Sequence, residues 1–524
     1  MGSCAQLFYS GDYMQTDVLI VGAGPTGLVL AIELLKRHIP VRIVEKLPTP
    51  QQQSRALGIQ ARTLEIFEKV GVIEKILQRG KSVNGMTIHK GRAPLFTFTI
   101  SPANTAYPFV FILPQSETES ILTEKLESLG GHVERNSLLT MINDTTATIV
   151  KPNGEEELIT AKYIIGCDGA HSTVRHVLGL PFKGSALAER FLLADVEADV
   201  PFPLDKGNLF LGNTELLLLI LLPVKDKLRL IALLHPDSPV DEKELDIDFL
   251  QKLLSLTSQT QTITIKNIAW VSRFSVHRRM VPTMDRNPIF LAGDAAHIHS
   301  PAGGQGMNTS IQDAFNLAWK LALVIQKKAG TQILSTYTLE RLPIAKKVLR
   351  GTSLLTKIIS KTLSYGAIFL FLGKYLLKIP KVKRALSQNV SELSYHYAKS
   401  PLSSQSKIDK KWLAPKPGYR APDVVFENKR LYDFMRTERF ILLVFAPKES
   451  FPIEQKHLKE IDVLEVSSIE QKPHCLYDPK GEIAKEYDAD SSCFFLIRPD
   501  GYISYRRKQG SIAEFTLFLE KIFL

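Results

Sequence analysis

Three glycines, Gly22, Gly24 and Gly27, form the pattern G-x-G-x-x-G and constrain the fold of this chain more than any other feature. They stand between an apolar, β-branched run at 17–21 and a helical pattern, and a second apolar run ends at Glu45. In such a unit the first glycine permits a tight turn, the second lets the backbone approach a pyrophosphate, and the third allows the helix to pack closely on the strand. The acid at the end of the second run can accept hydrogen bonds from ribose hydroxyls. The order of strand, glycine turn, helix and strand predicts a βαβ unit that binds a dinucleotide.

The start of the predicted helix supplies further candidate contacts. Its first turn offers free backbone N–H groups and the positive end of the helix dipole to the phosphates of such a ligand. Pro25 and Thr26 open this helix, and Lys46 directly follows the acid of the second run. We therefore include these three residues among the candidate dinucleotide-binding residues. This unit alone does not distinguish FAD from NAD.

Two further motifs make that distinction. Asp168 follows another buried-type run and opens the pattern D-G-x-x-S-x-x-R, which ends at Arg175. Gly293 and Asp294 also follow a predicted strand, and they lead through a glycine-rich loop into a long helical pattern. Doubly wound sheets bind ligands at the carboxyl ends of their strands, so Asp294 is expected to hold a ribityl hydroxyl. The loop and helix start would favour negative charge on a reduced flavin. The candidate residues there are Pro301, Gly304, Gly306, Met307 and Asn308.

With these three motifs in this order, the chain resembles the aromatic-ring hydroxylase family typified by para-hydroxybenzoate hydroxylase and phenol hydroxylase. The resemblance extends from Asp17 to the C-terminus, and it adds two residues to the candidate FAD site. Arg55, in the segment 54–58, is similar to the family arginine that contacts FAD. Gln115 stands where the family has its FAD-binding glutamine.

The resemblance also implies a reaction. It implies FAD as the cofactor, NAD(P)H as the co-substrate and O2 as the second substrate. The expected activity is that of a class A flavin monooxygenase, similar to those of EC 1.14.13. Such an enzyme hydroxylates a phenolic or polycyclic aromatic small molecule through a flavin C4a-hydroperoxide. The side chains that grip the substrate differ among family members, so no catalytic residue is assigned here.

The fold class expected is α/β, with a Rossmann-like FAD-binding domain, an inserted β-sheet domain for the substrate, a helical segment and a C-terminal thioredoxin-like domain. The predicted FAD-binding domain consists of 14–82, 105–183 and 284–345. The predicted substrate-binding domain consists of 83–104 and 184–283, followed by a helical connection at 346–415 and the last domain at 416–524. A redox thioredoxin needs C-x-x-C after its first strand, and 446–450 there reads Ala-Pro-Lys-Glu-Ser. The last domain is therefore expected to be structural or interfacial.

Composition excludes several other classes. The chain has 524 residues, a formal charge of +11 and four cysteines, none of them clustered, which argues against a disulfide framework or a metal site. The polar start at 1–15 and the cysteine usage fit a cytoplasmic protein. No basic stripe interleaved with aromatic residues points to nucleic acid. The most lipophilic stretch, 354–377, is broken by Lys357, Lys361 and Lys374, so we expect a buried or interfacial helix rather than a membrane span.

Some alternatives stay open at this stage. A halogenase would carry W-x-W-x-I-P, whereas the three tryptophans here are isolated, and a quinone-pathway hydroxylase would lack the last domain. A flavin-binding sensor without turnover is the alternative from a different class. Among the histidines, His297 belongs to the third motif, and His299 is more typical of a packing residue than of a base. A homodimer is one oligomeric state that this organisation allows.

Overall fold

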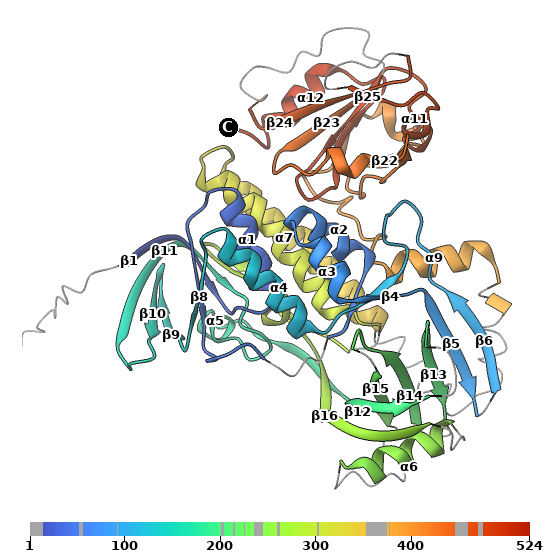
Figure 1. Ribbon diagram of the computed structural model, residues 1–524. Helices are drawn as coiled ribbons and strands as arrows, with labels where there is room; N and C mark the ends of the chain where they lie inside the picture. The colour runs from blue at the N-terminus through green and yellow to red at the C-terminus, as the bar shows by residue number, and fades with distance from the viewer. Residues whose placement is uncertain are drawn as a thin grey trace, which may run out of the picture.

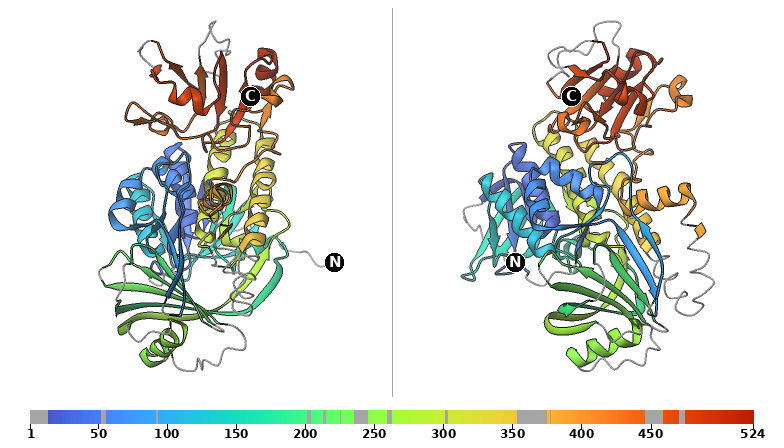
Figure 2. Two further views of the ribbon diagram at one scale, coloured as in Figure 1. Left: turned by 90° about the vertical axis from the view of Figure 1, so that its right-hand side faces the viewer. Right: turned by 45° about the vertical axis from the view of Figure 1, so that its right-hand side comes forward.

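The computed structural model describes residues 14–51, 56–91, 93–200, 204–212, 215–224, 226–234, 245–258, 263–300, 303–352, 375–376, 378–445, 459–469 and 475–524. Both views of Figure 2 show three parts in a row. A unit of helices and a mostly parallel sheet lies in the middle, with a curved sheet at one end and a smaller α/β module at the other.

The central sheet is built around five parallel strands. Their order is β18-β11-β1-β2-β8, with an antiparallel strand β17 at the edge, while β10 and β9 extend β11 as an antiparallel meander. Both faces of the inner strands are buried, which explains their continuous apolar runs. The bounds are β1 (Met14–Val21), β2 (Val41–Glu45), β8 (Val133–Arg135), β9 (Leu138–Asn143), β10 (Thr146–Val150), β11 (Glu156–Gly166), β17 (Asp285–Arg286) and β18 (Ile289–Leu291).

Helices pack on this sheet and on one another. Figure 1 shows α1, α4, α2 and α7 standing side by side, and α1 contacts both α7 and α4. The longest, α7, is buried almost throughout, because its apolar side chains fill the main core. The bounds are α1 (Pro25–Lys36), α2 (Ala61–Val70), α3 (Ile73–Arg79), α4 (Gln115–Ser128), α5 (Thr173–Val177), η1 (Gly293–Ala295) and α7 (Gly306–Ile325). A small sheet of β3 (Gly58–Ile59), β7 (Val110–Ile112) and β4 (Lys81–Val83) lies beside them.

The curved sheet combines two separate parts of the chain. Its order is β19-β16-β12-β15-β14-β13-β5-β6, and all pairs are antiparallel except β13 with β5. Helix α6 covers one face. The bounds are β5 (Gly85–Lys90), β6 (Ala93–Thr99), β12 (Lys183–Asp199), β13 (Gly207–Leu211), β14 (Glu215–Leu221), β15 (Lys227–Leu234), α6 (Ile247–Ser258), β16 (Thr264–Met280) and β19 (His297–Ile298).

The C-terminal module has a six-stranded sheet of order β20-β27-β26-β23-β24-β25. A helix over 336–352 and α9 (Pro380–Val390) precede it. Its strands are β20 (Ser404–Gln405), β23 (Phe440–Phe445), β24 (Ile461–Ser467), β25 (Cys475–Tyr477), β26 (Cys493–Ile497) and β27 (Ile503–Arg507). The remaining elements are η2 (Thr331–Ser335), η3 (Ile408–Lys411), β21 (Val425–Phe426), β22 (Lys429–Arg430), η4 (Leu431–Phe434), α11 (Glu482–Glu486) and α12 (Ile512–Leu519).

This architecture confirms the expected α/β fold, in which a Rossmann-like parallel sheet is combined with a second β-sheet unit and a C-terminal α/β module. The lipophilic stretch at 354–377 lies outside the described residues, apart from 375–376. Among the helices that the structure describes, none has both the length and the apolar character required to cross a bilayer.

Candidate functional site

The three sequence motifs meet at one edge of the central sheet. They follow β1, β11 and β18, which are neighbours in that sheet and run parallel. The strand ends are joined by the Cys167 N–H, which donates to the Val21 carbonyl at 2.7 Å. The Ala292 N–H likewise donates to the Gly166 carbonyl at 3.0 Å. The three motifs are far apart in the chain, but the shared carboxyl edge of a parallel sheet brings them together.

Gly24 leaves open space at the start of α1. It is the N-cap of this helix, has no side-chain cap, and adopts a φ of −73°. A Cβ atom built on Gly24 would meet no other atom within 4 Å. Packing inside the protein therefore does not explain a glycine at this position. A ligand that approaches the backbone here would explain it, because a side chain would stand in its way. The open space in front of a helix N-terminus fits the pyrophosphate of FAD.

Glu45 is fixed beside that space. Its Oε2 accepts from the Ala23 N–H at 2.9 Å, and its Oε1 accepts from the Leu47 N–H at 3.0 Å. A carboxylate has about four acceptor positions, so a half-exposed Glu45 can accept further hydrogen bonds from a ribose. Lys46 is exposed next to it. Both placements are compatible with the adenosine end of FAD.

Asp294 belongs to the third motif and Thr26 to the first. Asp294 belongs to the short helix η1 at the end of β18, and its side chain is exposed. Thr26 is buried, and a Cβ atom built on Gly293 would lie 2.9 Å from its Oγ1. The first and third motifs are therefore in direct contact.

The second motif supports the third. Arg175 donates from Nη1 to the Ala295 carbonyl at 2.9 Å and from Nη2 to the Ala170 carbonyl at 2.8 Å. Asp168 accepts from the Val174 N–H at 3.1 Å, and burial raises the pKa of its carboxyl. In this structure Asp168 therefore positions α5, and through α5 the arginine that holds η1.

The loop before α7 is held by Asn308, which is fully buried. Its Oδ1 accepts from the Gln60 N–H at 2.8 Å, and its Nδ2 donates to the carbonyls of Gly58 at 2.9 Å and Gly304 at 2.7 Å. The side chain of Asn308 thus joins β3, the loop and α7. Met307 is buried in the main core, whereas Gly304 is exposed and Gly306 is half-buried. Any contact of this segment with a flavin ring therefore comes from its backbone.

Three further residues were predicted from the sequence to contact FAD. Gln115 opens α4 and donates from Nε2 to Glu119 at 2.8 Å, while its N–H donates to the Ala56 carbonyl at 3.1 Å. Arg55 and Pro301 lie outside the described residues.

Asp313 is a central residue of the site that was not predicted from the sequence. Its Oδ2 accepts from the Gly293 N–H at 3.1 Å and from His297 Nε2 at 2.7 Å. Its Oδ1 accepts from Arg341 Nε at 2.6 Å, and the side chains of all three partners in this ionic group are fully enclosed. Burial opposes ionisation, yet Arg341 and His297 keep the pKa of Asp313 below its ordinary value.

One sequence signal could have identified this network. Asp313, Asn316 and Lys320 follow one another at helical spacing inside an otherwise apolar helix. Polar residues on a buried helix face need partners, so this stripe indicates buried ionic contacts. The network assigns His297 to a structural role. Burial lowers the pKa of His299 to about 4, and its Nδ1 lies 3.0 Å from the Ser300 carbonyl.

Two protein families match long parts of this chain. The family described as "FAD binding domain" matches residues 15–352, and the family described as "Aromatic-ring hydroxylase, C-terminal" matches residues 414–523. Among the residues that the structure describes, no group of His, Cys, Asp and Glu side chains could hold a metal ion.

Three individual relatives cover nearly the whole chain. The chain is 31% identical to 6-methylpretetramide 4-monooxygenase of Streptomyces rimosus, over 97% of this chain and 94% of the relative. It is 32% identical to pentachlorophenol 4-monooxygenase of Sphingobium chlorophenolicum, over 95% and 94%. The solved structure of an anhydrotetracycline hydroxylase from Streptomyces rimosus matches with a TM-score of 0.78 and 28% identity, over 97% of this chain and 99% of that one.

Proposed function

We propose that this chain, which belongs to the FAD-dependent aromatic-ring hydroxylases, is a class A monooxygenase. It uses NAD(P)H and O2 to hydroxylate a phenolic or polycyclic aromatic small molecule. The observation that carries this proposal is the meeting of the three motifs at the carboxyl edge of β1, β11 and β18. The relatives named for pentachlorophenol and for a pretetramide support the substrate class.

Each part of FAD has residues that fit it. The pyrophosphate would lie in front of Gly24, where Pro25 and Thr26 begin α1. The adenosine ribose would be held by Glu45, with Lys46 beside it, and the ribityl chain by the exposed carboxylate of Asp294. The remaining proposed contacts of the cofactor are Gly22, Gly27, Arg55, Gln115, Asp168, Gly293, Pro301, Gly304, Gly306, Met307 and Asn308.

This placement assigns separate roles to the cofactor and to the protein. When bound, FAD supplies the electron transfer from NAD(P)H and the activation of O2. The N-terminus of α7 would stabilise negative charge in front of Gly306, because the first N–H groups of the helix and the positive end of its dipole point there. Asn308 keeps the loop at the geometry that this requires, by fixing the Gly304 carbonyl. Asp313 does the same for the Gly293 turn.

The leucine-rich strand β14 supports a lipophilic substrate. Leu217 and Leu219 are fully buried on the face covered by α6. Leu218 and Ile220 alternate with them on the opposite face and are only half-buried, and Ile220 packs toward Leu57, next to β3. The second face of the curved sheet therefore presents apolar side chains toward β3, the strand that the Asn308 side chain joins to α7. A flat aromatic molecule would be bound there by apolar contact.

A substrate screen tests this function. Phenols and polycyclic aromatic compounds are added to the holoenzyme with NADH or NADPH, and O2 uptake is measured. We expect at least one compound to stimulate uptake and to yield a product with one added oxygen atom, which isotopically labelled O2 traces to the gas. If no compound stimulates NAD(P)H oxidation, the chain is a flavin-binding protein without turnover. A cytoplasmic location and a homodimer are part of the proposal, and fractionation and light scattering test them.

A further inference from the structure

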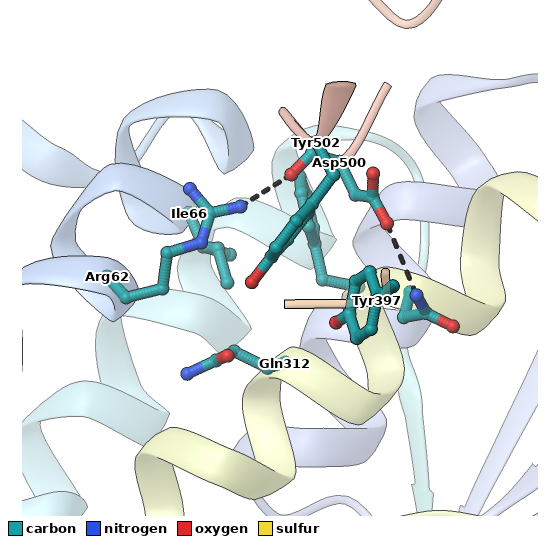
Figure 3. A pocket seen from close by; sticks show the side chains of 8 residues that line it. Arg62, Ile66, Gln312, Tyr397, Asp500 and Tyr502 are labelled. Carbon is teal, nitrogen blue, oxygen red and sulfur yellow. Dashed lines mark hydrogen bonds between the residues drawn. The ribbon is translucent and has the colours of Figure 1, made fainter. Parts of the chain in front are cut away.

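The C-terminal module inserts a tight turn between α2 and α7. Figure 3 shows Asp500 and Tyr502 of this turn above α7, opposite Arg62 of α2. Arg62 donates to the Asp500 carbonyl, and Asp500 Oδ2 accepts from Asn316 at 3.2 Å and from Trp319 at 3.3 Å. The module is therefore in contact with α7, the helix that begins at Gly306 in the proposed FAD site.

Arg498, just before this turn, makes a buried bidentate ion pair. Its Nη1 and Nη2 donate to the two carboxylate oxygens of Glu340 at 2.7 and 2.9 Å. Lys320 of α7 donates to the same carboxylate at 2.8 Å, and the side chains of all three residues are 0% exposed. Burial alone would raise the pKa of Glu340, but Arg498 and Lys320 hold it below its ordinary value. Glu340 is therefore a carboxylate that stays ionised only while its partners are in place.

Arg341 is the next residue on the same helix and faces the cofactor site. Its Nε donates to Asp313, which in turn accepts from the Gly293 N–H. Its Nη2 donates to the Thr309 carbonyl, in the first part of α7, at 3.1 Å. Since Glu340 and Arg341 are adjacent on one helix, any displacement of the backbone at one of them also moves the other.

Tyr397 forms a second connection. Its hydroxyl accepts from Arg341 Nη1 at 2.9 Å, and its ring centre lies 4.3 Å from that of Tyr502 in the module. The Arg498 guanidinium lies 5.0 Å from the centre of the Tyr397 ring. The module is thus connected to Arg341 in two ways. One connection is Glu340, the residue before Arg341 on the helix, and the other is the side chain of Tyr397.

A small cavity lies at the same junction, and Arg62, Gln312 and Tyr397 are among its lining residues (Figure 3). Within the described part of the protein, Arg62 Nε and Gln312 Oε1 are buried without a hydrogen-bond partner. The junction is therefore polar and closely fitted, which is the kind of contact that fixes one arrangement of its helices.

We propose that Arg498 is a positioning residue for the cofactor site, because it fixes Glu340 and Arg341 and thereby the Asp313 contact to the Gly293 turn. The C-terminal module then holds the FAD site in its binding geometry, although no predicted FAD contact lies in the module. This inference rests on the FAD site of the proposed function.

Two pairs of variants test it on the full-length holoenzyme. Arg498→Met removes the contact to Glu340, and its control Arg430→Met removes another bidentate pair between the module and the central unit, at Glu68. Tyr397→Phe removes one buried hydrogen bond to Arg341, and its control Tyr487→Phe removes one buried hydrogen bond, to the Pro422 carbonyl, inside the module. The dissociation constant of FAD is measured from the fluorescence of released flavin, together with the urea midpoint of unfolding.

We expect Arg498→Met and Tyr397→Phe to raise the dissociation constant of FAD by about three- to thirtyfold, the range of coupling through packed networks. Each control should lose comparable stability and keep its FAD affinity, and Arg498→Lys should recover part of the loss. If Arg498→Met does not fold, the two tyrosine variants decide. Unchanged FAD affinity in Tyr397→Phe, or equal losses in the controls, would overturn this inference alone. A wild-type chain that holds no FAD would overturn the proposed function as well.

Discussion

A Cβ atom on Gly27 would lie 2.0 Å from the carbonyl oxygen of Gly22, which is far inside van der Waals contact. The atom that blocks it belongs to the backbone of the glycine turn and cannot rotate away. The third glycine of the motif is therefore required by the packing of α1 against the turn. Gly24, two residues after Gly22, has open space instead.

Alanine substitutions should separate these two requirements. Gly27→Ala is expected to lower the free energy of unfolding by about 1–3 kcal/mol or more, because it overpacks against backbone. Gly24→Ala should change it by less than about 0.5 kcal/mol, since its φ of −73° suits alanine, and yet weaken FAD binding. Urea unfolding of the apoprotein and titration with FAD measure the two effects. Wild-type FAD affinity in Gly24→Ala would place the pyrophosphate elsewhere.

Removal of the Asp294 carboxylate should weaken FAD retention with little effect on folding. The side chain is exposed, so alanine leaves no cavity in the core. A lost hydrogen bond to a ribityl hydroxyl in the closed site would cost about 1–3 kcal/mol, or roughly 5- to 150-fold in affinity. Equilibrium dialysis of FAD measures this loss. Asp205→Ala, which removes another exposed carboxylate, serves as the control, and equal affinity in both variants would remove Asp294 from the site.

The sequence predicted the elements whose signals are local. The apolar run at 17–21 became the buried half of β1, and the helical pattern after Gly306 became α7, because strand and helix periods are properties of short segments. The shared edge of the three motifs could also be predicted, since parallel strands place their carboxyl ends together.

The contacts behind these motifs could not be predicted in this way. Asp313, Arg341 and Arg498 are joined only in the folded chain, and no local pattern specifies which buried acid meets which arginine. The hydrogen bonds of the Asn308 side chain could not be predicted either. Its place in the loop predicts a cofactor contact, and in the structure its side chain also bonds backbone groups at Gly58 and Gln60, next to a strand, β3, that is too short to predict.

Negative charge at the start of α7 should lower the reduction potential of the flavin. Gln305 is the N-cap of this helix and is half-buried, so Gln305→Glu adds a carboxylate where N–H groups point outward. The helix end is worth up to about 2 kcal/mol to an anion, and about 1.4 kcal/mol corresponds to about 30 mV for two electrons. We therefore expect a fall of some tens of millivolts in a spectroelectrochemical titration, and slower reduction by NAD(P)H. Gln305→Asn controls for shape, and an equal potential in both variants would show that this helix end does not face the flavin.

Glu392 should make the stability of the protein depend on pH. It is fully buried, adopts a φ of +60°, and accepts hydrogen bonds from Thr309 and Gln312. Burial raises the pKa of its carboxyl to about 8, against the opposing influence of Arg341. Between the ordinary value of 4.5 and this value, the folded protein keeps a proton that the unfolded chain has released. Stability therefore falls as pH rises through this window, by at most about 1.4 kcal/mol per pH unit for one proton.

Glu392→Gln tests this dependence, because the amide resembles the protonated acid and does not titrate. Urea midpoints of the wild-type and variant proteins are compared between pH 5 and pH 7.5, and their difference is used because other groups titrate equally in both. Burial also lowers the pKa values of Lys69 and Lys320 to about 8, and because both lysines are present in both proteins, their titration cancels in the difference. We expect the variant to gain stability relative to wild type as pH rises across this range. A constant difference would mean that Glu392 is already ionised at pH 5, held by Arg341 despite its burial.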